Sequence, residues 1–279
     1  MNIIEPSTAK KARIEYFNSF GEMYNYAKDN DEPKSSNGNS KEWAGTKTLA
    51  SACDLARNGW TEVRPMVDEI LGDLTERLAD KLDNLYKPQY DFGGAYVDMG
   101  RFVEGDPECM VTFQAVEAGA MGRVIKIAVS GTASAFIDPE DIKKRGIAII
   151  SLVDTINKLG FGVELWWDST IEHTGRHCTA VKLHDSADTL DINSVMFALA
   201  HPSMLRRLAF SVQEQSSKAK EQNVGGGYGC PSTMGIVEAF DFDVTVEKLQ
   251  DGRGDIVNNP MGWVMTTLKG LDIIGDVEA

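Results

Sequence analysis

Cysteine is sparse in this sequence, and no two cysteines stand close together. The four are Cys53, Cys109, Cys178 and Cys230, and none forms a CxxC pair. Structural zinc sites need closely spaced cysteine or histidine ligands, so this spacing argues against one. Isolated thiols of this kind are typical of reduced cysteines in a cytoplasmic protein.

The sequence also lacks a long apolar run. No stretch approaches the roughly 18 apolar residues that a transmembrane helix needs. The first residues, MNIIEPSTAKK, do not contain the apolar core of a signal peptide. We therefore expect a protein that neither spans a membrane nor is secreted, and we place it in the cytoplasm.

Positive charge is scarce as well. The chain has 28 Lys and Arg residues against 42 Asp and Glu residues, a formal charge of −14. This charge argues against nucleic-acid binding by overall electrostatics, although a local basic face remains an alternative. That face would use Arg206 and Arg207, the only adjacent arginine pair, together with Lys218 and Lys220. In the other interpretation, the two arginines pair with acidic groups on the protein's own surface.

Motifs of cofactor-dependent enzymes are missing too. Gly225-Gly226-Gly227 is not followed by Gly-Lys-Ser/Thr, so it is not a phosphate-binding loop. His173, His177, Cys178 and His184 are close in the sequence, but the two histidines at 173 and 177 flank a Thr-Gly-Arg turn. Residues placed around a turn share no helix face, which argues against a common metal ion. We therefore expect no cofactor and favour a protein that is not an enzyme.

What the sequence does contain is a strand, a helix and a second strand in succession. Residues 124–129 are an apolar run of strand length, and the small residues 130–134 end it. Asp138 and Pro139 form a helix start, and apolar residues then recur at helical spacing until Gly160. Residues 161–167 are a second apolar strand. This βαβ unit predicts a parallel sheet covered by helices, and we expect a three-layer α/β/α sandwich with a mainly parallel sheet.

Three regions are expected along the chain: an N-terminal helix and polar linker over residues 1–41, a helical region over 42–88, and the α/β sandwich over 89–279. Residues 29–41 are rich in turn-forming residues and should be exposed and outside regular structure. Elsewhere, periodicity predicts helices over 9–28 and 62–85 and a strand over 236–246.

Carboxylates gather around one arginine in a stretch that reads as short strands joined by turns. They are Asp98, Glu104, Asp106 and Glu108, and the arginine is Arg101. Clustered carboxylate oxygens suit a hard cation, so a metal-dependent enzyme is one hypothesis. Acids solvated at the surface, with Arg101 paired to one of them, are the simpler interpretation.

Part of this chain resembles the opening of a von Willebrand factor A-type domain. The matching stretch is AVSGTASAFIDPEDIKKRGIAIISLVDTINKLGFGVEL. In that fold the first strand runs into an Asp-x-Ser-x-Ser metal loop, and a long helix leads back to the next strand. Thr132 and Ser134 match hydroxyl ligand positions, whereas Ser130 stands where the family has its aspartate. The resemblance implies an α/β core, and the missing aspartate argues against a bound divalent cation.

A second resemblance, to an uncharacterised and largely phage-encoded family, spans more of the chain. It rests on five marks: Trp43-Ala-Gly, Asn58-Gly59-Trp60, residues 97–102 (VDMGRF), residues 105–110 (GDPECM) and Ala200-His201-Pro202. The resemblance implies a viral or prophage origin and work inside the cytoplasm of the host cell. It supplies no catalytic residues.

Our leading hypothesis is binding of another macromolecule, most simply a protein, through loops at the carboxyl edge of the sheet. Open α/β sheets bind ligands at that edge. Ser130, Thr132 and Ser134 should meet the loop over residues 168–178 there. Asp98, Arg101, Arg206 and Arg207 are further candidate binding residues. The alternatives are a nucleic-acid-binding protein of phage replication and a metal-dependent enzyme using the carboxylates over 98–108.

Overall fold

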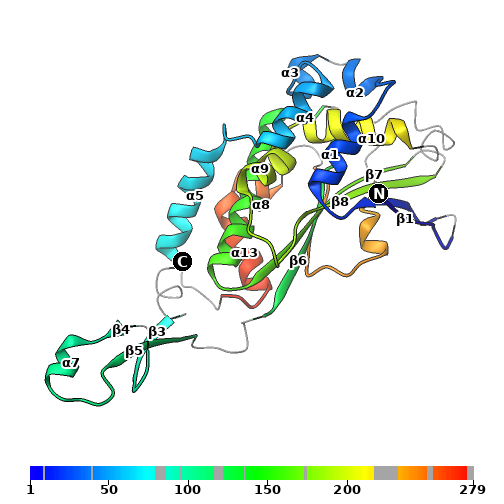
Figure 1. Ribbon diagram of the computed structural model, residues 1–279. Coiled ribbons are helices and arrows are strands. Elements are labelled where there is room, and N and C mark those ends of the chain that lie inside the picture. The colour runs from blue at the N-terminus through cyan, green and yellow to red at the C-terminus, as the bar shows by residue number, and fades with distance from the viewer. Residues whose placement is uncertain are drawn as a thin grey trace.

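A six-stranded sheet forms the centre of the protein (Figure 1). The computed structural model describes residues 1–8, 10–38, 40–78, 86–94, 96–115, 122–134, 136–172, 175–216, 232–249 and 254–274. Strand order is β1-β2-β8-β7-β6-β9. The strands are β1 (Asn2–Ile4), β2 (Arg13–Phe17), β6 (Val124–Ser130), β7 (Gly162–Glu172), β8 (Arg176–His184) and β9 (Val244–Val246).

Most pairings in this sheet are parallel, which confirms the α/β prediction. The pairs β2–β8, β6–β7 and β6–β9 are parallel, while β1–β2 and β7–β8 are antiparallel. The predicted βαβ unit is present: β6 leads into α8 (Pro139–Lys158), which returns to the parallel strand β7. Asp138 caps α8 by accepting a hydrogen bond from the N–H of Glu140.

The helices pack against one face of the sheet. Figure 1 shows them gathered on one side, and a single hydrophobic cluster joins most of them to β6, β7 and β8. Besides α8 they are α1 (Phe20–Lys28), α2 (Ser35–Gly38), α3 (Lys41–Ala44), α4 (Leu49–Asn58), α5 (Arg64–Arg77), α9 (Ile192–Ala200), the π-helix η1 (Met204–Ala209), α10 (Phe210–Gln215), α12 (Asp255–Asn258) and α13 (Pro260–Gly270). Among the described residues, no helix is long and apolar enough to cross a membrane.

In the described part of the chain, one segment covers the opposite face of the sheet. We call residues 232–243 the strap; it contains the 3₁₀ helix η3 (Ile236–Glu238). Met234 and Ile236 are buried there against Ala128, Trp166 and other sheet residues. Within the described part of the chain, the strap takes the place of the third layer that we predicted. The prediction of a mainly parallel sheet with helices is thus confirmed, and a second helical layer is not seen among the described residues.

Two local predictions need correction. Residues 9–28 are not one helix: β2 pairs with β8, and Ser19 then caps α1. In RIEYF the side chains alternate between the two sheet faces, and this period of two prevails over helical spacing. Residues 236–246 are not one strand either, because they hold η3, an irregular stretch and then β9.

Most of the described residues in the polar segment over 29–41 are exposed, as expected, but α2 and the buried Ser36 lie within it. Ser36 is fully buried in α2. Its hydroxyl donates to Glu214 Oε2 over 2.6 Å, and its N–H donates to Glu214 Oε1 over 3.0 Å. The N–H of Lys34 donates to the same carboxylate over 3.1 Å. Glu214 therefore replaces water as the hydrogen-bond partner of Lys34 and Ser36.

A second, smaller sheet projects from the body. It has the order β3-β5-β4, with β3 (Tyr86–Asp91), β4 (Tyr96–Val97) and β5 (Met110–Ala115). The short helix α7 (Met99–Val103) follows β4. Figure 1 shows this unit extending away from the helices and the central sheet. We call residues 86–115 the arm.

Candidate functional site

The small-residue loop at the carboxyl end of β6 turns inward. Ser130 and Thr132 are buried, and their hydroxyl oxygens lie 2.8 Å apart in a hydrogen bond. A Cβ at Gly131 would lie 1.9 Å from the Trp167 ring, so only glycine fits under the indole. Ser134 is half-buried. The loop is an internal packing element, and two of its three hydroxyl groups are withdrawn from solvent.

Arg145 closes the same edge of the sheet from α8. Its guanidinium donates to the carbonyl oxygens of Ser130 over 2.7 Å, Val246 over 3.1 Å and Glu247 over 2.7 Å. Burial lowers the pKa of Arg145 to about 10. The cavity left beside it, lined by Trp167 and other residues, holds about 20 Å³. That is room for about one water molecule.

Residues 168–178 do not form the loop that we predicted at this edge. Residues up to Glu172 belong to β7, and those from Arg176 belong to β8, which pair as a hairpin. They therefore extend the sheet rather than converging with Ser130, Thr132 and Ser134 in an open crevice.

Arg206 and Arg207 are buried in η1 rather than exposed. Arg206 donates to the carbonyl of Ile137 over 3.1 Å and lies 4.5 Å from the centre of the Trp43 ring. Arg207 donates to the carbonyls of Ser36 over 2.9 Å and Thr46 over 2.8 Å. The two side chains hold residues 36–47 against the helices. They are not placed to meet a phosphate group at the surface, and Lys218 and Lys220 lie outside the described residues.

The carboxylates over residues 98–108 stand on the arm and serve its local structure. Asp98 caps α7, accepting from the N–H groups of Gly100 over 2.9 Å and Arg101 over 3.2 Å. The N–H of Arg101 is the main cause that lowers the pKa of Asp98. Arg101 lies 3.4 Å from Asp106 and stacks 3.7 Å from the centre of the Tyr90 ring. This pairing matches the simpler interpretation of the acids.

The described acids and histidines are not gathered around a common point. Throughout the described ranges, no group of three or more His, Cys, Asp or Glu side chains is arranged to hold a metal ion. His173 lies outside those ranges. His177 is fully buried in β8, and His184 is buried at the end of the same strand.

Large apolar side chains are exposed on the arm. On α7, Phe102 and Val103 lie three and four residues after Met99, about one helical turn, and the three side chains are 58%, 78% and 64% exposed, respectively. Phe92, after β3, is 71% exposed. Tyr90 and Val97 are also exposed. This apolar surface was not predicted, because the sequence alone does not show which side of a short helix lacks a neighbour.

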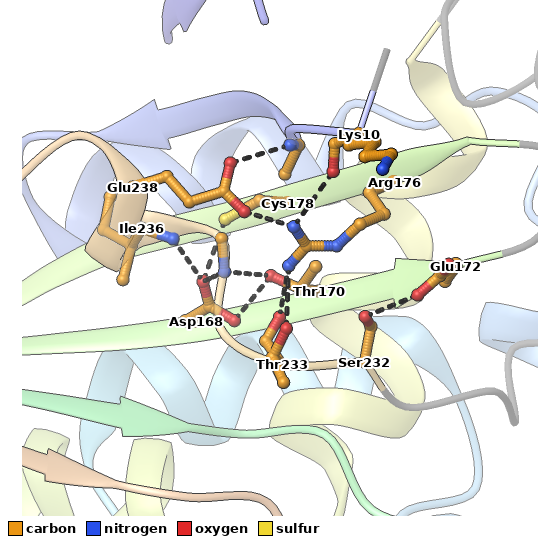
Figure 2. Close-up of polar contacts among 12 residues, drawn as sticks. Lys10, Asp168, Thr170, Glu172, Arg176, Cys178, Ser232, Thr233, Ile236 and Glu238 are labelled. Atoms are coloured by element: carbon orange, nitrogen blue, oxygen red, sulfur yellow. Dashed lines mark hydrogen bonds and ion pairs between the residues drawn. The ribbon is translucent and has the colours of Figure 1, made fainter. Parts of the chain in front are cut away.

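A buried polar cluster fastens the strap to the central sheet, as Figure 2 shows. Asp168 is fully buried and accepts hydrogen bonds from Thr170 Oγ1 over 2.8 Å and Cys178 Sγ over 2.9 Å. It also accepts from the N–H groups of Gly235 over 3.1 Å and Ile236 over 2.9 Å. Burial raises the pKa of the Asp168 carboxyl, although these hydrogen bonds act in the opposite direction.

Arg176 connects β8 to the strap at one end of the same cluster. It forms an ion pair with Glu238 and donates to the Thr233 carbonyl over 2.9 Å and the Lys10 carbonyl over 3.4 Å (Figure 2). Ser232 donates to Glu172 over 2.9 Å. Every polar group named here already has a hydrogen-bond partner within the protein, so we assign the cluster a structural role in attaching the strap to the sheet. Asp168, a lone acid after an apolar strand, was the available sequence signal.

A second buried polar cluster lies on the helix-facing side of β2 and β8. Glu15 Oε1 accepts from Arg13 over 3.2 Å and from Ser216 over 2.9 Å. Its other oxygen lies 3.6 Å from His177 Nε2. Burial lowers the pKa of His177, despite the opposing effect of Glu15. Burial thus favours the neutral form of this fully buried ring.

One comparison identifies the family. The family described as "Domain of unknown function (DUF7192)" matches residues 4–274. The chain belongs to this family. No curated protein and no solved structure matches it. The expectation of an uncharacterised family is confirmed, and the DUF7192 match covers the sheet, the strap and the arm together.

Proposed function

We propose that this DUF7192 protein acts by binding another protein through the exposed apolar surface of its arm. One observation carries the proposal. Eleven large apolar side chains are exposed among the described residues, and six of them stand on the arm. Clustered exposed apolar surface is characteristic of interaction sites, whereas single exposed apolar residues are ordinary.

The arm also has the rigidity that a binding surface needs. The Asp98 cap fixes the start of α7, and the stacking of Arg101 on Tyr90 fixes the helix against β3. The helix backbone that carries Met99, Phe102 and Val103 is thereby held in place before a partner binds. A preorganised surface loses less conformational entropy on binding.

The proposal keeps protein binding but moves the surface from the carboxyl edge to the arm. Ser130 and Thr132 are buried, and Arg145 occupies the space above them. The nucleic-acid alternative is less supported, because Arg206 and Arg207 are turned inward. The metal-dependent alternative is less supported, because Asp98 caps a helix and Arg101 sits among the acids.

Three further elements of the proposal rest on sequence resemblance and composition. We infer a phage or prophage source, work in the cytoplasm of the host cell, and a core related to von Willebrand factor A-type domains. The β6–α8–β7 unit supports the last of these, since it has the strand, loop and helix order of that fold.

A photocrosslinking experiment tests the binding surface. A photoreactive phenylalanine analogue is placed at Phe102 on the arm or at Phe136, which is 98% exposed on the body. In cells that naturally make the protein, the Phe102 position should crosslink to a specific protein and the Phe136 position should not. Crosslinks of equal yield and pattern at both positions would refute the arm as the binding surface.

The crosslinked protein is then purified for a direct binding measurement. Phe102→Ser with Val103→Ser should abolish its binding, and Phe136→Ser should leave binding unchanged. All three side chains are exposed, so the variants should unfold at the temperature of the parent protein.

A further inference from the structure

The charged groups around the apolar tip of the arm are mostly acidic. Residues 86–115 contain five acids (Asp91, Asp98, Glu104, Asp106 and Glu108) and two bases (Lys87 and Arg101), a formal charge of 2 − 5 = −3. Asp91, Glu104 and Glu108 are exposed. Arg101 is already engaged with Asp106 and the Tyr90 ring. Asp91 adjoins Phe92 in the chain and Glu104 adjoins Val103, so exposed carboxylates neighbour the exposed apolar side chains; we call Asp91, Glu104 and Glu108 the acidic border.

We propose that the partner of the arm is a protein whose docking surface is an apolar recess bordered by lysine or arginine side chains. This inference rests on the proposed function and adds the chemistry of the partner. Met99, Phe102 and Val103 would enter the recess, where burial of apolar surface supplies most of the affinity. Glu104 and Glu108 would meet the basic border, which sets orientation and speeds association.

The same charges disfavour other occupants. A second copy of this chain would bring its own −14 charge and another acidic arm against the first. Nucleic acid and anionic lipid surfaces would be repelled for the same reason. A basic protein is the occupant for which the apolar tip and its acidic border both contribute favourably.

Two labelled peptides serve as probes for this chemistry. Both are helical and about 18 residues long; one contains leucine and lysine, and the other leucine and glutamate. Fluorescence anisotropy measures their binding to the full-length protein. The lysine peptide should bind and the glutamate peptide should not. The affinity of the lysine peptide should fall as the salt concentration rises, because the Debye length shrinks from about 10 Å at 0.1 M to about 3 Å at 1 M.

Matched charge reversals locate the interaction. Glu104→Lys with Glu108→Lys on the arm should weaken the lysine peptide about tenfold, as expected for two border charges. Glu69→Lys with Glu76→Lys, at exposed positions of α5, changes the net charge equally and should weaken it less than about twofold. Phe102→Ser should remove binding.

The outcomes separate this inference from the proposed function. In one outcome, Phe102→Ser removes binding while the two pairs of charge reversals weaken it equally. In that case the arm is a binding surface but the charges on it do not select the partner, which overturns the inference and leaves the proposed function standing. If Phe102→Ser changes nothing, the inference and the arm as binding surface both fail. Equal binding of the two peptides also overturns the inference. A dimer in light scattering that Phe102→Ser dissociates would make a second copy the occupant.

Discussion

Removal of the buried Asp168 carboxylate should loosen the strap and destabilise the protein. In Asp168→Ala, the N–H of Ile236 and the hydroxyl of Thr170 lose their acceptor, while the Gly235 N–H keeps Thr170 Oγ1 at 2.8 Å. Each buried group left without a partner costs about 1–3 kcal/mol. The thiol of Cys178 is a weak donor and adds little. We expect a loss of about 3 kcal/mol in the free energy of unfolding at pH 7.

The Asp168→Asn variant keeps a hydrogen-bond acceptor at this position and removes the negative charge, so it tests the two contributions separately. An amide of the same shape can still accept from Ile236 through its oxygen and donate to Thr170 through its nitrogen. It also spares the folded protein a buried charge. We expect this variant to lose about 1 kcal/mol or less, well under the loss for alanine.

The pH dependence of the two proteins should differ in a defined direction. Burial raises the folded-state pKa of Asp168 above its unfolded value. Such a group contributes stability below the unfolded pKa, about 4, and loses that contribution as pH rises through the folded pKa. The stability of the parent protein should therefore fall relative to Asp168→Asn as pH rises from about 4 to 7.

Urea unfolding followed by tryptophan fluorescence measures these differences, because Trp166 and Trp167 precede Asp168 in β7. Hydrogen exchange at the Gly235 and Ile236 amides gives a local measurement of the strap. If Asp168→Ala unfolds within about 0.5 kcal/mol of the parent protein, or if those amides exchange no faster, Asp168 does not hold the strap.

Three further predictions concern the core, the packed N-terminal segment and the edge of the sheet. Ile149→Ala on the buried side of α8 should cost about 2–5 kcal/mol in urea unfolding, and the exposed Lys144→Ala less than about 0.5 kcal/mol; similar losses would contradict the assigned helix face. Residues 29–38 should resist limited proteolysis in the parent protein and become cleavable in Glu214→Ala, which removes the acceptor of Ser36; early cleavage in the parent would contradict this packing. Gly131→Ala should destabilise by about 1–3 kcal/mol because its Cβ would overlap Trp167, whereas Gly72→Ala, with open space in α5, should stabilise by up to about 1 kcal/mol; thermal unfolding distinguishes the two signs.

The central βαβ unit could be predicted from the sequence because its determinants are local. The Asp138 cap, Pro139 and the apolar spacing of α8 all act within a few turns of the chain. The short apolar runs on either side are strands in the structure, and they pair as predicted.

The candidate site could not be predicted in the same way, because its residues depend on distant partners. Arg207 looks like a surface cation in the sequence, yet its acceptor Ser36 is 171 positions away. Likewise, Glu214 accepts a hydrogen bond from Ser36, which is 178 positions away in the sequence. No local pattern encodes such pairings, so the sequence could not show that Arg206, Arg207 and Ser36 are buried.

Exposure, too, was decided only by the tertiary structure. MGRFV on the arm and the apolar turns of α8 have similar residues, but one faces solvent and the other lies in the core. The sequence by itself determined the type and order of the βαβ elements, since backbone preference and periodicity act over short distances. Only the folded chain determined which apolar surfaces were left uncovered, because burial depends on which distant segments occupy the neighbouring space.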